Sequence, residues 1–69
     1  MRAANIHNSD RLQRVLAVLM DYKRHTTRDI IRNAHVCAVN SIISELRVNG
    51  VRILCERKGN KLFYELAID

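Results

Sequence analysis

The chain has no proline, two glycines and three aromatic residues among its 69 positions. Proteins that bind single-stranded nucleic acid usually stack bases on exposed aromatic rings, so this composition argues against that class. The longest uninterrupted apolar run, Val15 to Met20, is far too short to span a bilayer. The first residues also lack the apolar core of a signal peptide. We therefore expect a cytoplasmic protein with no membrane contact.

Catalytic and metal-binding patterns are missing as well. The two cysteines, Cys37 and Cys55, form no CxxC pair, and no His/Cys cluster has zinc spacing. The acidic residues are scattered and accompany no glycine-rich loop. We expect no enzymatic activity, no small-molecule substrate, no metal and no cofactor. Cys37 is expected to be a surface or half-buried thiol, and Cys55 a core residue of a strand.

Positive charge is what the sequence has in excess. Twelve Lys and Arg against seven Asp and Glu give a net charge of +5 and a pI near 9.9. Such an excess attracts polyanions without conferring specificity, and it also occurs simply as solubilising charge. The basic residues cluster at 23–32, with Asp29 as the only acid, and again at 57–61. These clusters favour a polyanionic partner.

The chain is long enough for one small domain, expected at residues 9–69 after a flexible tail at 1–8. Leu12, Val15, Leu16 and Leu19 recur at helical spacing, which predicts a first helix. Ser9 or Asp10 is its expected cap, and the helix should end near residue 23.

A second helix should begin at Thr26 or Thr27. Thr26 and Asp29 have capping-box spacing, and a very short strand at Thr26 is possible. The break after this helix falls near residues 35–36, where Asn33 or His35 would carry the bend because these residue types tolerate positive φ. A third helix is expected over 37–49, ended by Gly50.

Alternating patterns follow at 51–55 and 62–66, joined by a glycine-containing turn at 58–60. The expected fold class is α+β, mainly α, with three helices and a C-terminal two-stranded β-hairpin. This order outlines a winged helix-turn-helix, whose second motif helix enters the major groove of DNA. Helix 37–49 should turn small and polar residues outward, and the base-contact candidates are Ala38, Asn40, Ser41, Ser44 and Arg47.

Phosphate contacts are expected from the two basic clusters. A helix N-terminus favours an anion through its free N–H groups and its dipole, and the hairpin would form the wing. Each charge is also explicable as an ordinary solvated side chain, but their coincidence with two DNA-proximal elements favours function. The candidates are Thr27, Arg28, Arg32, Arg57, Lys58, Asn60 and Lys61.

These residues resemble a group of short winged helix-turn-helix proteins common in bacteriophages and prophages. The match runs from Thr26-Thr27 through Ile43-Ser44-Glu45-Leu46 and Gly50 to the hairpin. His35 departs from the pattern, because the family usually has glycine there. The resemblance implies binding to double-stranded DNA inside a bacterial host cell, as a transcriptional regulator or as an excisionase-like architectural factor.

A protein-interaction module on the same scaffold is the alternative from another class. Leu54 and Phe63 alternate to the face opposite Ile53 and Tyr64. If the N-terminal tail does not cover them through Ile6, they form an exposed apolar patch for a protein partner or a homodimer.

Overall fold

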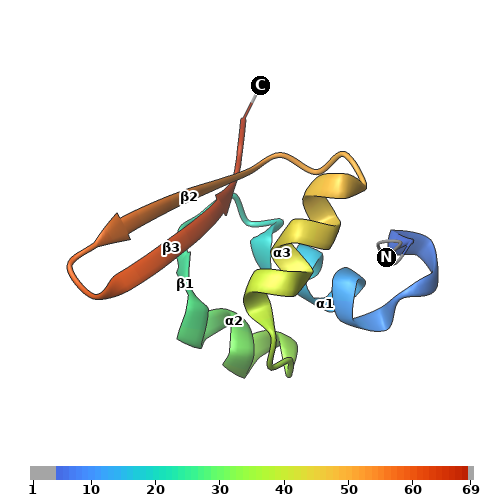
Figure 1. Cartoon of the computed structure of the whole chain (residues 1–69), viewed down its shortest axis with the longest axis horizontal. Helices are drawn as coiled ribbons and strands as arrows, with labels where there is room; N and C mark the ends of the chain where they lie inside the picture. The colour runs from blue at the N-terminus through green and yellow to red at the C-terminus, as the bar shows by residue number, and fades with distance from the viewer. Residues whose placement is uncertain (1–4, 69) are drawn as a thin grey trace.

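Three α-helices and one antiparallel sheet form the described part of the chain, residues 5–68 of the computed structural model (Figure 1). The sheet has three strands in the order β1-β3-β2, so the expected hairpin is extended by the short strand β1. This small α+β architecture is compatible with a winged-helix-like fold. The elements are η1 (Ile6–Asn8), α1 (Asp10–Leu19), β1 (His25–Thr26), α2 (Thr27–Ala34), α3 (Val39–Val48), β2 (Ile53–Lys58) and β3 (Lys61–Leu66).

Helix α1 begins as expected and ends early. The Ser9 hydroxyl accepts a hydrogen bond from the Leu12 N–H at 3.4 Å, so Ser9 is the cap. The helix ends at Leu19 rather than near residue 23, and that expectation is wrong. Tyr22 adopts a left-handed conformation with φ 59°, and the Asp21 carboxylate accepts from the Lys23 N–H. This turn redirects the chain into β1.

Helix α2 starts with the expected capping box. The Thr26 hydroxyl accepts from the Asp29 N–H at 3.1 Å, and the Asp29 carboxylate accepts from the Thr26 N–H at 3.2 Å. The bend after α2 lies at His35, whose φ of 55° is left-handed. Both predictions are confirmed. Helix α3 begins at Val39, two residues later than expected.

Helix α3 ends in the glycine turn that its sequence predicts. Gly50 has φ 92°, and its N–H donates to the carbonyl of Arg47 at 3.0 Å. The Val51 N–H donates to the carbonyl of Leu46, also at 3.0 Å. This pair of bonds is the Schellman motif, which satisfies carbonyls that the helix end leaves without partners.

Strand β3 pairs with β1 on one side and β2 on the other. His25 lies opposite Tyr64 in one ladder, and Cys55 lies opposite Tyr64 in the other. Lys58 pairs with Lys61, so the hairpin turn contains only Gly59 and Asn60. Gly59 has a φ of 60°, which glycine adopts at little cost.

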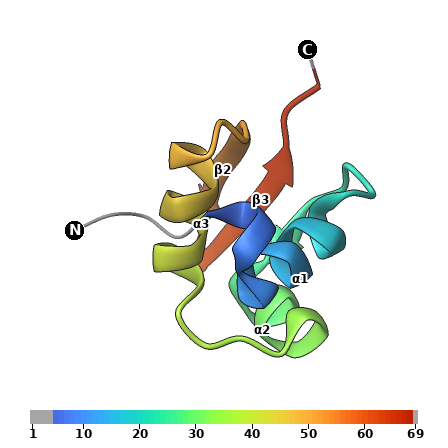
Figure 2. The same ribbon diagram turned by 90° about the vertical axis from the view of Figure 1, so that its right-hand side faces the viewer.

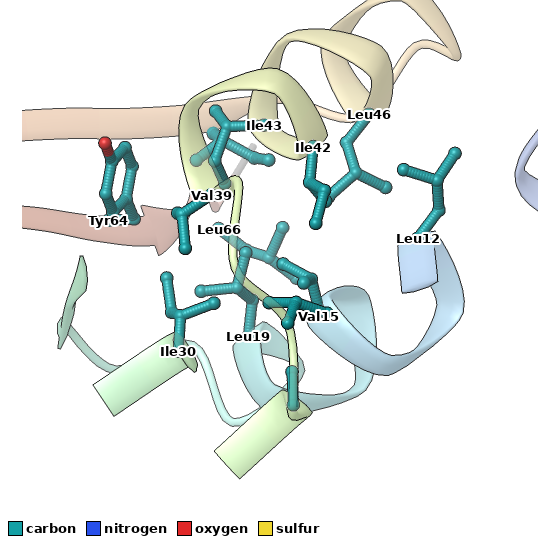
Figure 3. Packing of buried hydrophobic residues seen from close by; sticks show 13 residues of the cluster. Leu12, Val15, Leu19, Ile30, Val39, Ile42, Ile43, Leu46, Tyr64 and Leu66 are labelled. Atoms are coloured by element: carbon teal, nitrogen blue, oxygen red, sulfur yellow. The ribbon is translucent and has the colours of Figure 1, made fainter. Parts of the chain in front are cut away.

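The core lies between the three helices and the sheet (Figure 3). It contains aliphatic side chains from every helix together with Tyr64 from β3. Cys55 is exposed, so the expectation that it belongs to the core is wrong. Ile53 lies on the same face of β2 and is buried, but it is the only buried residue of that strand, because the hairpin projects beyond the helices (Figure 1). The buried residues are Leu12, Val15, Leu19, Ile30, Ala34, Val36, Val39, Ile42, Ile43, Leu46, Ile53, Tyr64 and Leu66.

The N-terminal segment lies beside α1 and α3 (Figure 2). Ile6 packs against the core, and its N–H donates to the Asn49 side chain at 3.1 Å. Residues 6–8 of the expected tail therefore form a 3-10 turn, and residues 1–4 lie outside the described part of the chain. Within residues 5–68, no helix is long and apolar enough to cross a membrane.

Candidate nucleic-acid interface

One strip of the exposed surface of α3 carries only small, uncharged side chains. Val39, Ile42, Ile43 and Leu46 face the core, and Ser41, Ser44 and Val48 are exposed at spacings of three and four on the other side of the helix. Two of these exposed residues are among the base-contact candidates. The sequence reasoning missed Val48, which is 74% exposed. Its spacing from Ser41 and Ser44 is the signal that would have found it.

Two other base-contact candidates lie on the side of α3 that faces the sheet. The Asn40 side-chain oxygen accepts a hydrogen bond from the Tyr64 hydroxyl at 3.0 Å. The Arg47 guanidinium donates to the main-chain carbonyl of Ile53 at 2.8 Å. Both side chains are exposed, yet each is held by a residue of the sheet. Ala38 precedes the first helical turn and is exposed.

The opposite side of α3 is electrically balanced. Arg11 on α1 donates through one nitrogen to both carboxylate oxygens of Glu45, at 3.1 Å each. This pair anchors α3 to α1 and neutralises the acid on α3. Among the residues of α3, Arg47 is then the one exposed charge without an ion pair, and its guanidinium is held by the Ile53 carbonyl.

An open groove separates the start of α2 from the hairpin tip. We call it the α2–wing groove; its volume is about 560 Å³. It brings together four of the seven phosphate candidates from segments about thirty residues apart, and Arg32, Arg57 and Lys58 lie outside its lining. The residues that line it are Thr26, Thr27, Arg28, Asp29, Asn60, Lys61 and Leu62.

The α2–wing groove carries cations without bound counter-charges. Among the described residues, neither Arg28 nor Lys61 forms an ion pair with a carboxylate, and the same holds for Arg32, Arg57 and Lys58. The one acid that lines the groove, Asp29, already accepts a hydrogen bond from the Thr26 N–H. That backbone hydrogen bond lowers the pKa of Asp29 below its ordinary value, and the side chain of Thr26 contributes to the same shift to a smaller extent. Its carboxylate is therefore committed to the helix cap.

The Leu54 and Phe63 patch lies on the outer face of the sheet. Leu54 is 52% exposed, and the residues of η1 do not cover it, since Ile6 bonds to Asn49 at the far end of α3. Arg24 reaches across this face and pairs with Glu56 at 3.0 Å and with Glu65 at 3.7 Å. The patch is therefore small and framed by charges.

Reactive and metal-binding groups do not gather in the described part of the chain. Cys37 and Cys55 are both exposed, the first between α2 and α3 and the second in β2. Within residues 5–68, no three His, Cys, Asp or Glu side chains are close enough together to hold a metal ion.

Comparisons with protein-family models, with curated proteins and with solved structures gave no match. The geometry and charge of residues 5–68 therefore provide the basis for a functional proposal.

Proposed function

We propose that the protein binds double-stranded DNA as a winged helix-turn-helix, in the manner of a small phage or prophage transcriptional regulator. In this proposal α3 lies in the major groove, and the β2–β3 hairpin is the wing that contacts the backbone or the minor groove. The observation that carries it is the α2–wing groove, which Arg28 and Lys61 both line at the positive end of the α2 dipole.

In this proposal the cations and the uncharged strip of α3 contribute differently to DNA binding. The unpaired cations of α2 and the wing supply the attraction to phosphates, which is independent of sequence. The uncharged strip with Ser41, Ser44 and Val48 lets the α3 backbone approach base edges closely. Sequence preference then comes from a few polar contacts and from the apolar contact that Val48 offers to a thymine methyl group.

Binding to a randomised duplex library at low salt, followed by fluorescence anisotropy on the selected sequence, tests the proposal. Arg28→Ala and Lys61→Ala should each weaken binding to all duplexes alike and reduce the salt slope by about one. Lys23→Ala is the matched control, because Lys23 is exposed and lies outside the α2–wing groove. No binding to duplex DNA at low salt, or equal losses in all three variants, would contradict the proposal.

The same measurements separate a regulator from an excisionase-like architectural factor. A regulator should lose discrimination between selected and random duplexes when Ser41 and Ser44 are changed to larger side chains. An architectural factor should retain whatever small preference it has and lose affinity only through the wing and α2 changes. We expect the first result, since Ser41 and Ser44 are exposed and small enough for the α3 backbone to approach base edges closely.

A homodimer or protein partner on the outer sheet face is the second candidate, favoured by the 52% exposure of Leu54. Sedimentation of the wild type and of Leu54→Asp tests it. A wild-type mass twice that of the variant would support a dimer through this face. A monomeric mass for both would exclude a dimer at that site.

A further inference from the structure

Tyr64 is a core residue with one polar atom to satisfy. The residue is 3% exposed, and its ring lies at the edge of the buried cluster with the hydroxyl directed out of it (Figure 3). A buried hydroxyl that lacks a partner costs roughly 1–3 kcal/mol, so it requires an acceptor. Within residues 5–68 that acceptor is the side-chain oxygen of Asn40, 3.0 Å away on the first turn of α3.

This hydrogen bond fixes which way the Asn40 amide is turned. A carboxamide has an oxygen that accepts and an NH₂ that donates, on opposite sides of the same planar group. The Tyr64 hydroxyl can accept from an NH₂ as well as donate to an oxygen. Within residues 5–68 its proton has no acceptor other than Asn40, and with the amide oxygen facing it the buried hydroxyl is satisfied. With the oxygen held against the sheet, the NH₂ of the exposed Asn40 is turned away from Tyr64, at the N-terminal end of α3.

The orientation matters because DNA bases differ in what they present in the major groove. An asparagine that is free to turn pairs with adenine through both its oxygen and its NH₂, since adenine offers the N7 acceptor next to the N6 donor. An asparagine that presents only its NH₂ is suited to guanine, whose N7 and O6 are adjacent acceptors. Against adenine, the same NH₂ can donate only to N7 and meets the N6 amino group, donor to donor, where guanine offers the O6 acceptor.

We infer that Tyr64 is a specificity-determining positioning residue, which holds Asn40 as a hydrogen-bond donor and so selects guanine over adenine at one position of the bound DNA. This inference rests on the proposed function, and it gives Asn40 a guanine contact in place of the adenine contact that a freely turning asparagine makes. Tyr64 itself touches no base, because it is buried in β3 beneath the start of α3.

The test uses the duplex selected by the wild-type protein. The base pair that Asn40 reads is the one at which Asn40→Ala loses its preference. At that position the wild type should favour guanine over adenine by roughly fivefold to a hundredfold. Replacing that guanine by 7-deazaguanine, which lacks the N7 acceptor, should weaken wild-type binding and leave Asn40→Ala binding unchanged.

Tyr64→Phe isolates the positioning role, because it removes one hydroxyl and keeps the buried ring. We expect its guanine preference to fall towards equality with adenine while its affinity for random duplex stays at the wild-type level. Tyr22→Phe is the matched control, since Tyr22 is 44% exposed and its loss of a hydroxyl should change neither quantity.

The outcomes separate the two levels of the proposal. A wild type that prefers adenine at the Asn40 position, or a Tyr64→Phe variant that keeps the full guanine preference, would overturn this inference and leave DNA binding intact. A wild type that binds no duplex at low salt would overturn both. The NMR signals of the Asn40 side-chain NH₂ provide a readout without DNA, and they should shift in Tyr64→Phe and not in Tyr22→Phe.

Discussion

The Arg47 guanidinium at the end of α3 donates a 2.8 Å hydrogen bond to the main-chain carbonyl of Ile53, the first residue of β2. The bond spans the Schellman turn at Gly50 and connects the third helix directly to the hairpin. A residue expected to reach a base is thus employed in fixing the angle between α3 and the sheet.

Arg47→Ala should therefore lower the free energy of unfolding by about 1 kcal/mol, because it leaves a partly buried carbonyl without its donor. Urea denaturation followed by circular dichroism measures the change. Arg32→Ala removes the same charge from an exposed position without an ion pair and should stay within about 0.5 kcal/mol of the wild type. Equal effects of the two changes would show that the Arg47 bond contributes nothing to stability.

The capping box gives a second prediction. Thr26→Ala removes the hydroxyl that accepts the Asp29 N–H and should lower the free energy of unfolding by about 1 kcal/mol. Thr26→Ser retains the hydroxyl and should recover most of that loss. If the serine variant is as unstable as the alanine variant, the threonine contributes through its methyl group or its place in β1 rather than through the cap.

The cap also predicts a pH dependence. The hydrogen bond from the Thr26 N–H lowers the pKa of Asp29 below its ordinary value of 3.8. The folded protein therefore binds this proton less tightly than the unfolded chain does. The stabilisation is fully present above the ordinary pKa and is lost as the pH falls through the lower, folded value.

Denaturation of the wild type and of Asp29→Asn at a series of pH values measures this contribution. The stability difference between them should be constant near neutral pH and should shrink below a pH of about 4. Asp10→Asn is the control, since the Asp10 carboxylate makes no side-chain hydrogen bond in the described structure, and its difference from the wild type should not follow the same course. A wild-type advantage over Asp29→Asn that persists unchanged in acid would contradict the role of the carboxylate.

His35 is held in the left-handed conformation, which disfavours side chains with a Cβ atom. His35→Gly should raise the free energy of unfolding by at most about 1 kcal/mol, because part of the relief is offset by the greater entropy of glycine in the unfolded chain. His35→Val should lower it, since a β-branched residue is the least suited to positive φ. Thermal denaturation of both variants checks the order Gly, His, Val. A valine variant as stable as the wild type would refute the conformational argument.

Both thiols should be accessible in the folded protein. Cys37 and Cys55 are exposed, so a thiol reagent should modify both without denaturant. Cys55→Ser should change the free energy of unfolding by no more than about 0.5 kcal/mol, as for other exposed positions. Slow modification of Cys55 that speeds up in urea would instead place it in the core, as its strand alternation alone had suggested.

The sequence predicts local features of this fold well wherever a few neighbouring residues determine them. The Thr26 cap, the bend at His35 and the helix stop at Gly50 depend on backbone conformation and on contacts within four or five positions. The predicted end of α1 near residue 23 was wrong, because the composition of residues 20–23 is compatible with a helix. Their conformation follows from the left-handed Tyr22 and from the pairing of β1 with a distant strand.

The candidate site depends on contacts between residues that are remote in sequence, and so only part of it could be predicted from the sequence. Arg28 and Lys61 line the same groove because the sheet register brings residues 25–26 beside 63–64. The partner of Asn40 lies 24 positions away, and no periodicity indicates it. The prediction for Cys55 failed for a similar reason. Strand alternation indicates which face of the sheet a residue lies on, but not how far along the strand that face is covered.

Thr26 belongs to two elements at once, since it pairs with Phe63 in the sheet and its side chain caps α2. The edge of the sheet therefore cannot separate without loosening the first turn of the helix, and the helix cannot fray from its start without releasing the last pair of β1. Local opening of one element is thereby coupled to opening of the other. Amide hydrogens at the start of α2 and at the centre of β3 should consequently exchange with solvent in a single cooperative event.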